Sequence, residues 1–322
     1  MHPLVQALFS AWEWRLDITL SLLIVAILYT TGWWRLRQRS RNPRLASIKR
    51  LASYWGGLVI LAIALMSPID LLGSQLFFLH MIQHLLTIML AAPLLLLGTP
   101  FPFLLWGLPK PLRQMVGRQF ARAAVTRNLL YSVTQVSFVW LAFIVIYAGW
   151  HDPNLYGLAL RRDWVHDIQH LTFFTAAMLF WWHVIGTAPR LHHTPIWGRI
   201  ALLISVVPVN MAIGIAIATA DEAIYPYYTS VPRIWGFTVI EDQTLAGVIM
   251  WIPGSMMFLL AVLLLLANAL QTAAEEQVRP MTEWDTDETM VAPGLEHRVV
   301  QNRWQQLQQP QANSAERVAD GS

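Results

Sequence analysis

The chain of 322 residues contains no cysteine. It therefore has no disulfide, no thiolate metal ligand and no cysteine nucleophile, and a site for a soft metal ion must use histidine and methionine. Charged residues are also scarce, at 13% of the chain, which is about half their share in soluble proteins. Hydrophobic residues make up 56%. This composition indicates an integral membrane protein.

Motifs of the common enzyme classes are missing as well. The sequence has no glycine-rich phosphate loop, no HExxH or EF-hand motif, and no nucleophile–base pair in its polar loops. The net charge of +3 is small and unevenly distributed, a pattern typical of membrane topology and not of a nucleic-acid surface. We therefore expect a protein without catalytic turnover, in contact with the lipid bilayer and not with nucleic acid.

Several apolar stretches meet the length of about 20 residues that a membrane-spanning helix needs. Seven such stretches occupy residues 16–34, 51–67, 75–98, 129–149, 165–185, 199–219 and 244–268. The first has no basic leader and no small-residue cleavage site, so we interpret it as a retained span and not as a signal peptide. The sequence predicts an all-α, polytopic membrane protein with a seven-helix transmembrane domain at residues 16–268.

The basic residues predict the orientation. Residues 35–50 and 110–127 are rich in arginine and lysine, whereas the alternate loops carry most of the acids. Because basic loops stay in the cytoplasm, we expect the N-terminus outside and the C-terminus cytoplasmic. Residues 1–15 are then a short periplasmic N-terminus, and residues 269–322, which are polar and rich in glutamine, are a largely disordered cytoplasmic tail.

Two spans each carry a pair of histidines spaced four residues apart. His80 and His84 lie in the third span, and His166 and His170 open the fifth. This spacing places both rings of a pair on one helical face, and the predicted orientation places all four in the outer third of the membrane. Ionisable residues inside a membrane are costly, so we predict that these four form one metal site.

Further residues at the same depth are candidate contributors to the site. Asp167 lies on the same helical stripe as the fifth-span pair and is placed to orient an imidazole. Asp242 and Met250 begin the seventh span on that side, Met81 neighbours His80, and His151 lies in an outer loop; the candidates are Asp242, Met250, His151, Met81 and Asp167. We expect the third, fifth and seventh spans to adjoin at their outer ends.

The remaining histidines in this part of the chain are interpreted differently. His183, His192 and His193 lie at the inner end of the fifth span and beyond it. We expect them to be interfacial or exposed to solvent.

Three interpretations of the four-histidine site remain open. Imidazole with thioether and no thiolate suits copper best, and Cu(I) in particular, although zinc would accept the same ligands. A haem b would use only one histidine from each helix. Two haems would need histidines about 13 residues apart on both helices, and the third span has none near residue 97. The third interpretation is a metal-free scaffold in which the histidines are structural.

Residues from about 67 to 254 resemble the CtaG-type family of cytochrome c oxidase assembly factors, first associated with caa-type oxidases. The segments that carry the resemblance are His80–Leu86, Ala92–Pro100, His151–Tyr156, His166–His170, Phe180–Trp182 and Asp242–Trp251. Two departures are visible, since the family tends to have proline where this chain has Ala92 and His183. The resemblance implies a protein of the bacterial inner membrane that helps to mature a haem-copper oxidase by delivering copper. Its partners would be an oxidase subunit and other copper chaperones.

Overall fold

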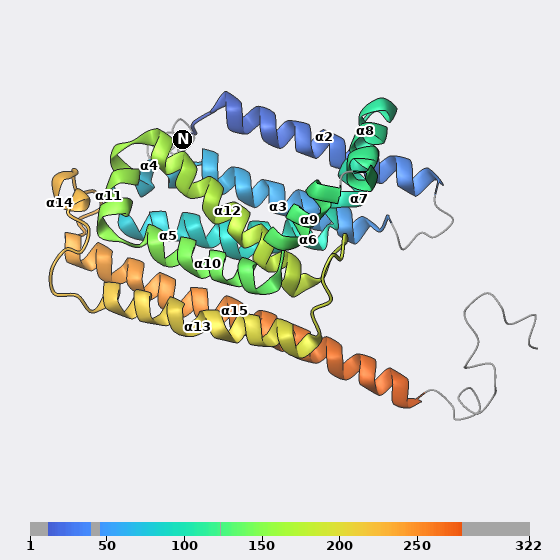
Figure 1. Ribbon diagram of the computed structural model, residues 1–322. Coiled ribbons are helices and arrows are strands. Elements are labelled where there is room, and N and C mark those ends of the chain that lie inside the picture. The colour runs from blue at the N-terminus through green and yellow to red at the C-terminus, as the bar shows by residue number, and fades with distance from the viewer. Residues whose placement is uncertain (1–11, 40–45, 123, 279–322) are drawn as a thin grey trace, which may run out of the picture. The chain divides into compact units, whose positions relative to one another are not determined.

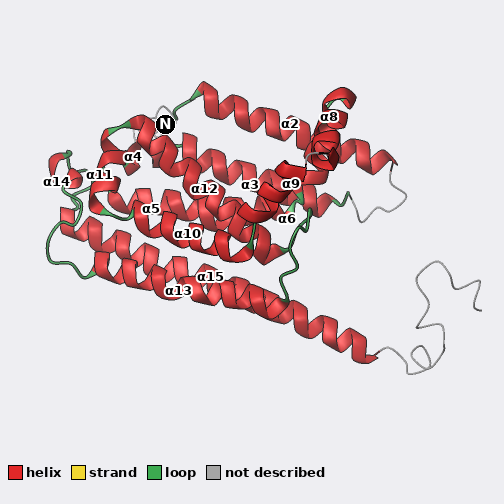
Figure 2. Cartoon of the chain, in the orientation of Figure 1, coloured by secondary structure: helices red, strands yellow, loops and turns green. Residues whose placement is uncertain are grey.

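The computed structural model describes residues 12–39, 46–122 and 124–278, and its regular structure over these residues is helical throughout, as predicted (Figure 2). The helices are α2 (Leu16–Arg39), α3 (Ile48–Met66), α4 (Pro68–Gly73), α5 (Phe77–Leu85), η1 (Leu86–Ala91), α6 (Ala92–Leu97), α7 (Pro100–Gly107), α8 (Lys110–Arg122), α9 (Ala124–Val133), α10 (Val136–Trp150), α11 (Pro153–Arg161), α12 (Asp163–Ile185), α13 (Ile196–Ala218), α14 (Tyr227–Ser230) and α15 (Val239–Val278).

Six helical segments among the described residues are long and apolar enough to cross a membrane. They are α2, α3, the continuous segment α5–η1–α6, α12, α13 and α15, and they agree with six of the predicted spans. The chain is thus a multi-pass membrane protein. A seventh crossing is counted only if α10 and α11, which meet at an angle of 73°, are one bent span. The side of the membrane on which each terminus lies stays a prediction.

The fourth predicted span, 129–149, differs from the helix observed there. The helix is interrupted at Thr134 and Gln135, and α10 has 15 residues, a length of about 22 Å against a bilayer core of about 30 Å. The Thr134 hydroxyl donates to the carbonyl of Leu130, and the Thr134 carbonyl accepts a hydrogen bond from the His183 ring. Side-chain bonds of this kind compete with helix continuation, which apolar composition does not reveal.

The third span contains a wide π-helical turn, η1, between α5 and α6. Pro93 is the second residue of α6, and proline has no amide to donate to the carbonyl four residues earlier. A π-helical turn absorbs such a disruption without ending the helix. The span therefore continues to Leu97, and its η1 and α6 parts pack between α3 and α12 (Figure 1).

The segment before the third span folds back on it. α4 lies against α5, and a Cβ on Gly73 would stand 3.4 Å from the backbone of His80, at van der Waals distance. As a result, α4 lies beside the first turn of the histidine-bearing helix.

The helix α15 packs on α13 through glycine. A Cβ on Gly247 would lie 2.5 Å from the amide nitrogen of Ala218, and one on Gly214 would lie 2.8 Å from Cβ of Trp251. Small residues that let backbones approach are a common device between membrane helices. Helix α15 continues to Val278, ten residues past the predicted end of the span at 268. Residues 1–11 and 279–322, which include most of both predicted terminal segments, lie outside the described residues.

Candidate metal centre

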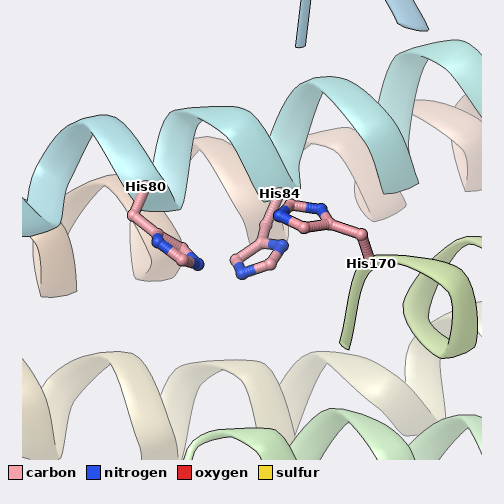
Figure 3. Close-up of side chains that lie close together, drawn as sticks. All are labelled: His80, His84 and His170. Atoms are coloured by element: carbon pink, nitrogen blue, oxygen red, sulfur yellow. The ribbon is translucent and has the colours of Figure 1, made fainter. Parts of the chain in front are cut away.

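The four histidines of the two predicted pairs lie together between α5 and α12. The ring centroids of His80 and His84 are 4.5 Å apart, and those of His84 and His170 are 5.1 Å apart. His166 stands 5.4 Å from His80, and its Nε2 lies 3.1 Å from Nε2 of His170. Figure 3 shows His80 and His84 reaching from one helix toward His170 on the other. The structure thus brings both pairs to one place.

The imidazoles at the centre are buried and lack partners. His80, His84 and His170 are only 1%, 6% and 8% exposed. Both ring nitrogens of His84, Nε2 of His80 and Nδ1 of His170 are buried without any hydrogen-bond partner. Leaving a buried polar atom unpaired costs about 1–3 kcal/mol. One nitrogen from each of these three rings lies within 4.8 Å of the others, so a single small ion can reach all three.

Asp70 is a further candidate ligand that the sequence analysis did not identify. Its carboxylate, with one nitrogen each of His166 and His170, forms a second group of ligand atoms within 4.8 Å of one another. The carboxylate accepts a hydrogen bond from Nε2 of Gln83, which also donates to the carbonyl of Ala64 at 2.9 Å. Burial raises the pKa of Asp70 to about 6, although the bond from Gln83 opposes this shift. His170 belongs to both groups, so the two form one continuous cluster.

We expected Asp167 to orient an imidazole, but it pairs with an arginine instead. Its carboxylate oxygens accept hydrogen bonds from the guanidinium of Arg15, at 2.6 and 3.0 Å, and Arg15 also pairs with Asp17 at 2.7 Å. The hydrogen bonds that Arg15 donates, first to Asp167 and then to Asp17, raise the pKa of Arg15. The acid and the base that flank the cluster therefore neutralise each other.

Two cavities adjoin the cluster beside the Arg15–Asp167 pair. One has a volume of about 380 Å³ and is otherwise mainly apolar, and the other has a volume of about 470 Å³ and also contains Glu13 and Asp163. Both are lined by Arg15, Asp70, His166 and Asp167. The cluster is therefore reached through Asp70 and His166, whereas His80 and His84 form its interior.

Asp242 is not a ligand in this arrangement. Its two oxygens accept hydrogen bonds from the backbone amides of Phe77 and Phe78, at 3.0 and 2.9 Å, and it pairs with Arg233 at 2.9 Å. It thus supplies the N-terminal cap that α5 does not obtain from its own preceding residue, Leu76. The predicted contact between the third and seventh spans exists, but its role is to hold the histidine helix.

The other three candidate contributors gather on one side of His84. Met81, His151 and Met250 line a small cavity of about 30 Å³ together with His84. Nδ1 of His151 lies 2.6 Å from the carbonyl of Tyr147, so this nitrogen is already used. These residues form a second, thioether-containing wall of the site. Among the described groups of histidine and carboxylate that can share an ion, however, none includes His151.

His183 is buried, contrary to the expectation of an interfacial or exposed ring. It is 6% exposed, and its Nε2 lies 2.8 Å from the carbonyl of Thr134, the residue at which the fourth predicted span is interrupted. Hydropathy alone does not predict that the Thr134 carbonyl is available to this ring. His192 is half-buried and His193 is exposed, as expected for positions beyond the span.

Comparison with known proteins agrees with the resemblance described above. The family described as cytochrome c oxidase caa3 assembly factor matches residues 27–272. An uncharacterized protein of Mycobacterium leprae is 27% identical over 276 residues, which is 83% of this chain and 40% of that protein. Uncharacterized proteins of Mycobacterium bovis and Mycobacterium tuberculosis are each 29% identical over 258 residues, or 77% of this chain and 38% of theirs.

The chain spans about two fifths of the length of the curated relatives it matches. No solved structure matches it. The family match extends over most of the chain and includes both histidine pairs, α4 and the Asp242 cap. The chain therefore belongs to the cytochrome c oxidase caa3 assembly factor family.

Proposed function

We propose that the chain binds copper at the histidine cluster, near the periplasmic face of a bacterial inner membrane, and passes it to a haem-copper oxidase during assembly. The observation that carries this proposal is the group of buried rings of His80, His84 and His170, each of which has an unpartnered nitrogen and offers one nitrogen within 4.8 Å of the other two. His166 and Asp70 extend the set. A bound ion would give these atoms the partners that the protein does not supply.

The spacing of the rings suits a small ion. Ligand nitrogens about 2.0 Å from a tetrahedral ion stand about 3.3 Å from one another. The Nε2 atoms of His166 and His170 are already 3.1 Å apart. The ligand nitrogens of His80, His84 and His170 lie up to 4.8 Å apart and would have to move closer together to bind one ion. Rotations of the side chains are enough for such a change, and the helices need not move far.

A haem is less well supported by the same geometry. A bis-histidine haem needs one ring on each face of a flat macrocycle, with the other rings kept away. Here the rings of both helices contact one another, with centroids of His84 and His170 only 5.1 Å apart. A macrocycle between the helices would have to separate these rings.

The chemistry of the ligands favours copper over harder ions. The cluster consists of imidazoles, with Met81 and Met250 across the small cavity beside His84, and the chain has no thiolate. Imidazole and thioether ligands suit Cu(I), whereas the second group, with the Asp70 carboxylate, suits Cu(II) or zinc equally well. Copper is therefore the cargo that the whole set accommodates best.

The path to the cluster also suits a cation. On one side, the site is closed by a cluster of three aromatic residues, Phe77, Tyr156 and Tyr228. The hydroxyls of Tyr156 and Tyr228 share a hydrogen bond of 3.0 Å. On the other side, the cavity of about 470 Å³ is lined by the Arg15–Asp167 pair, which is neutral, and by the carboxylates of Glu13, Asp70 and Asp163. Clefts lined by charge of one sign raise the local concentration of the opposite ion. Copper would enter and leave by this cavity.

The proposal is tested on purified protein. Wild type is loaded with copper, treated with a mild chelator and measured for bound metal, beside a variant in which His80, His84, His166 and His170 are all alanine. Wild type should retain copper and the variant should not, and neither should show a haem absorption band. His193→Ala, which changes an exposed histidine far along the chain, is the control and should retain copper. Equal copper in wild type and the quadruple variant would overturn the copper site.

The assembly role is tested in cells under copper limitation. His84→Ala and His170→Ala should give oxidase polypeptide that contains haem but too little copper and has low activity. Excess copper in the medium should partly restore that activity by mass action. If both variants support full oxidase activity under limitation, the histidines are structural and assembly depends on another surface of the protein.

A further inference from the structure

A separate pocket lies at the opposite end of α12 from His166 and His170. It has a volume of about 270 Å³ and is enclosed by the end of α12, the connection that follows it and the first turn of α13. Its polar lining includes Thr187, Arg190, Thr194 and Arg199. The copper proposal makes no use of this pocket.

Two arginines line the pocket without an acid. Nε of Arg190 donates to the carbonyl of Gly186 at 2.6 Å, and Nε of Arg199 donates to the carbonyl of Thr194 at 3.0 Å. Neither forms a salt bridge with any described carboxylate, and no acid lines the pocket. The backbone bonds fix both side chains at Nε, so the terminal amino groups of each guanidinium are available to an anion.

Two threonine hydroxyls in the same lining are buried and unused. Thr187 is 6% exposed and Thr194 is 8% exposed, and the Oγ1 atom of each has no hydrogen-bond partner. Most buried hydroxyls in proteins are paired, and an unpaired one is destabilising. A ligand with several acceptor oxygens would satisfy both hydroxyls together with the guanidinium groups.

The beginning of α13 adds to this electrostatic preference. The residue that precedes this 23-residue helix is Pro195, which has no side chain that can cap it. Pro195 therefore gives the amides of the first turn no hydrogen-bond acceptor from its side chain. The N-terminus of a helix carries a partial positive charge and favours anions. This field adds to the preference for an anion that the two arginines and the two hydroxyls give the pocket.

The histidines of the pocket do not make it a second metal site. Nε2 of His183 lies 2.8 Å from the Thr134 carbonyl, and Nε2 of His192 lies 3.1 Å from the Tyr131 carbonyl. These bonds fix the rings in the wall. A cation would also meet two uncompensated arginines, so the charge of the pocket excludes it.

We propose that this pocket binds a phosphate group, presented either by an anionic phospholipid or as a free phosphate. Planar guanidinium groups match phosphate oxygens in geometry and charge, and basic pockets at the ends of membrane helices suit phospholipid headgroups. Arg190 and Arg199 supply the charge. Thr187 and Thr194 supply neutral donors.

The test measures the thermal unfolding of the full chain in neutral detergent during titration with three probes. These are phosphatidylglycerol, which is anionic, phosphatidylcholine, which is zwitterionic, and inorganic phosphate. Stabilisation by phosphatidylglycerol alone supports a lipid ligand, and stabilisation by inorganic phosphate as well supports a site open to free phosphate. No stabilisation by either anionic probe overturns the proposal.

Variants assign any stabilisation to the pocket. The double variant Arg190→Gln with Arg199→Gln should bind the effective probe about tenfold more weakly or worse, since it loses charge-assisted hydrogen bonds. Thr187→Val with Thr194→Val keeps the charge and should weaken binding about threefold to tenfold. Arg118→Gln removes one charge from an exposed position on α8 and should bind like wild type.

Two results of the variant series would overturn the assignment. One is equal affinity in wild type and the threonine variant, and the other is a loss in Arg118→Gln as large as that in the arginine variant. If the arginine variant does not fold, the threonine variant decides, because it leaves the bonds from Nε to the backbone in place.

Discussion

Asp242 accepts a hydrogen bond from the backbone amide of Phe77 at 3.0 Å, and so caps a helix that begins 165 residues earlier in the chain. The same carboxylate is 0% exposed and pairs with Arg233. This contact holds the start of the histidine helix in place from another part of the fold.

Asp242→Ala should therefore destabilise the protein strongly. It uncaps two amides and leaves the partly buried Arg233 without its acid, a loss of about 3–5 kcal/mol for a buried pair. Asp242→Asn keeps an acceptor and should lose less. Thermal unfolding in detergent measures both, with the exposed Asp221→Ala as the control. Equal melting temperatures of Asp242→Ala and Asp221→Ala would contradict the capping role.

Asp70→Asn should stabilise the metal-free protein at pH 7.5 and not at pH 4. Burial raises the folded-state pKa of Asp70 from 3.8 to about 6. Ionisation of this carboxyl group therefore opposes folding as the pH rises above 3.8. The penalty is absent where the group is protonated in both states and is complete above about pH 6. Because the residue is partly exposed, we expect the substitution to raise the free energy of unfolding at pH 7.5 by about 1–3 kcal/mol.

The same Asp70 variant should bind copper more weakly, because it loses an anionic ligand. Unfolding curves at the two pH values, with chelator and with copper, separate the two effects. A variant that is less stable than wild type at pH 7.5 without metal would show that the carboxylate stabilises the fold.

His84→Leu should leave the metal-free protein as stable as wild type or more stable by about 1–3 kcal/mol, because it removes two buried nitrogens that have no partner. The stabilisation that copper gives to wild type should shrink in the variant, since a bound ligand stabilises in proportion to the logarithm of its concentration over Kd. His193→Leu should keep the full copper effect. An undiminished copper effect in His84→Leu would remove this residue from the site.

The absence of cysteine permits a direct test of topology. Asn154→Cys, on α11, and Gln114→Cys, on α8, introduce single thiols at exposed positions on loops of opposite predicted side. A membrane-impermeant maleimide should label Cys at 154 in intact cells or spheroplasts and reach position 114 only after the membrane is opened. The reverse pattern would show that the N-terminus is cytoplasmic.

Hydropathy and spacing predicted much of this architecture. Six span positions follow from apolar length alone, and the histidine pairs were identified because two rings on one face of an apolar helix have a high desolvation cost. Those properties belong to single segments. They can be recognised without knowing which segments lie side by side.

The parts that were missed depend on contacts between segments. Asp70 was not among the predicted ligands, because nothing local shows that α4 folds back so that Gln83 can bond its carboxylate. Asp242 was expected at the metal because it shares the depth of the histidines, but its carboxylate accepts from the free amides at the start of α5 instead. Likewise, the burial of His183 follows from the carbonyl of Thr134.

The π-helical turn at Leu86–Ala91 separates the third span into two angular registers. Such a turn acts as one residue inserted into an α-helix, and one residue corresponds to a rotation of about 100°. The half that carries His80 and His84 is thereby aimed independently of the half that begins at Ala92. Deleting one residue within the turn would turn one half away from its neighbours, so the length of this span is constrained by rotation as well as by the thickness of the bilayer.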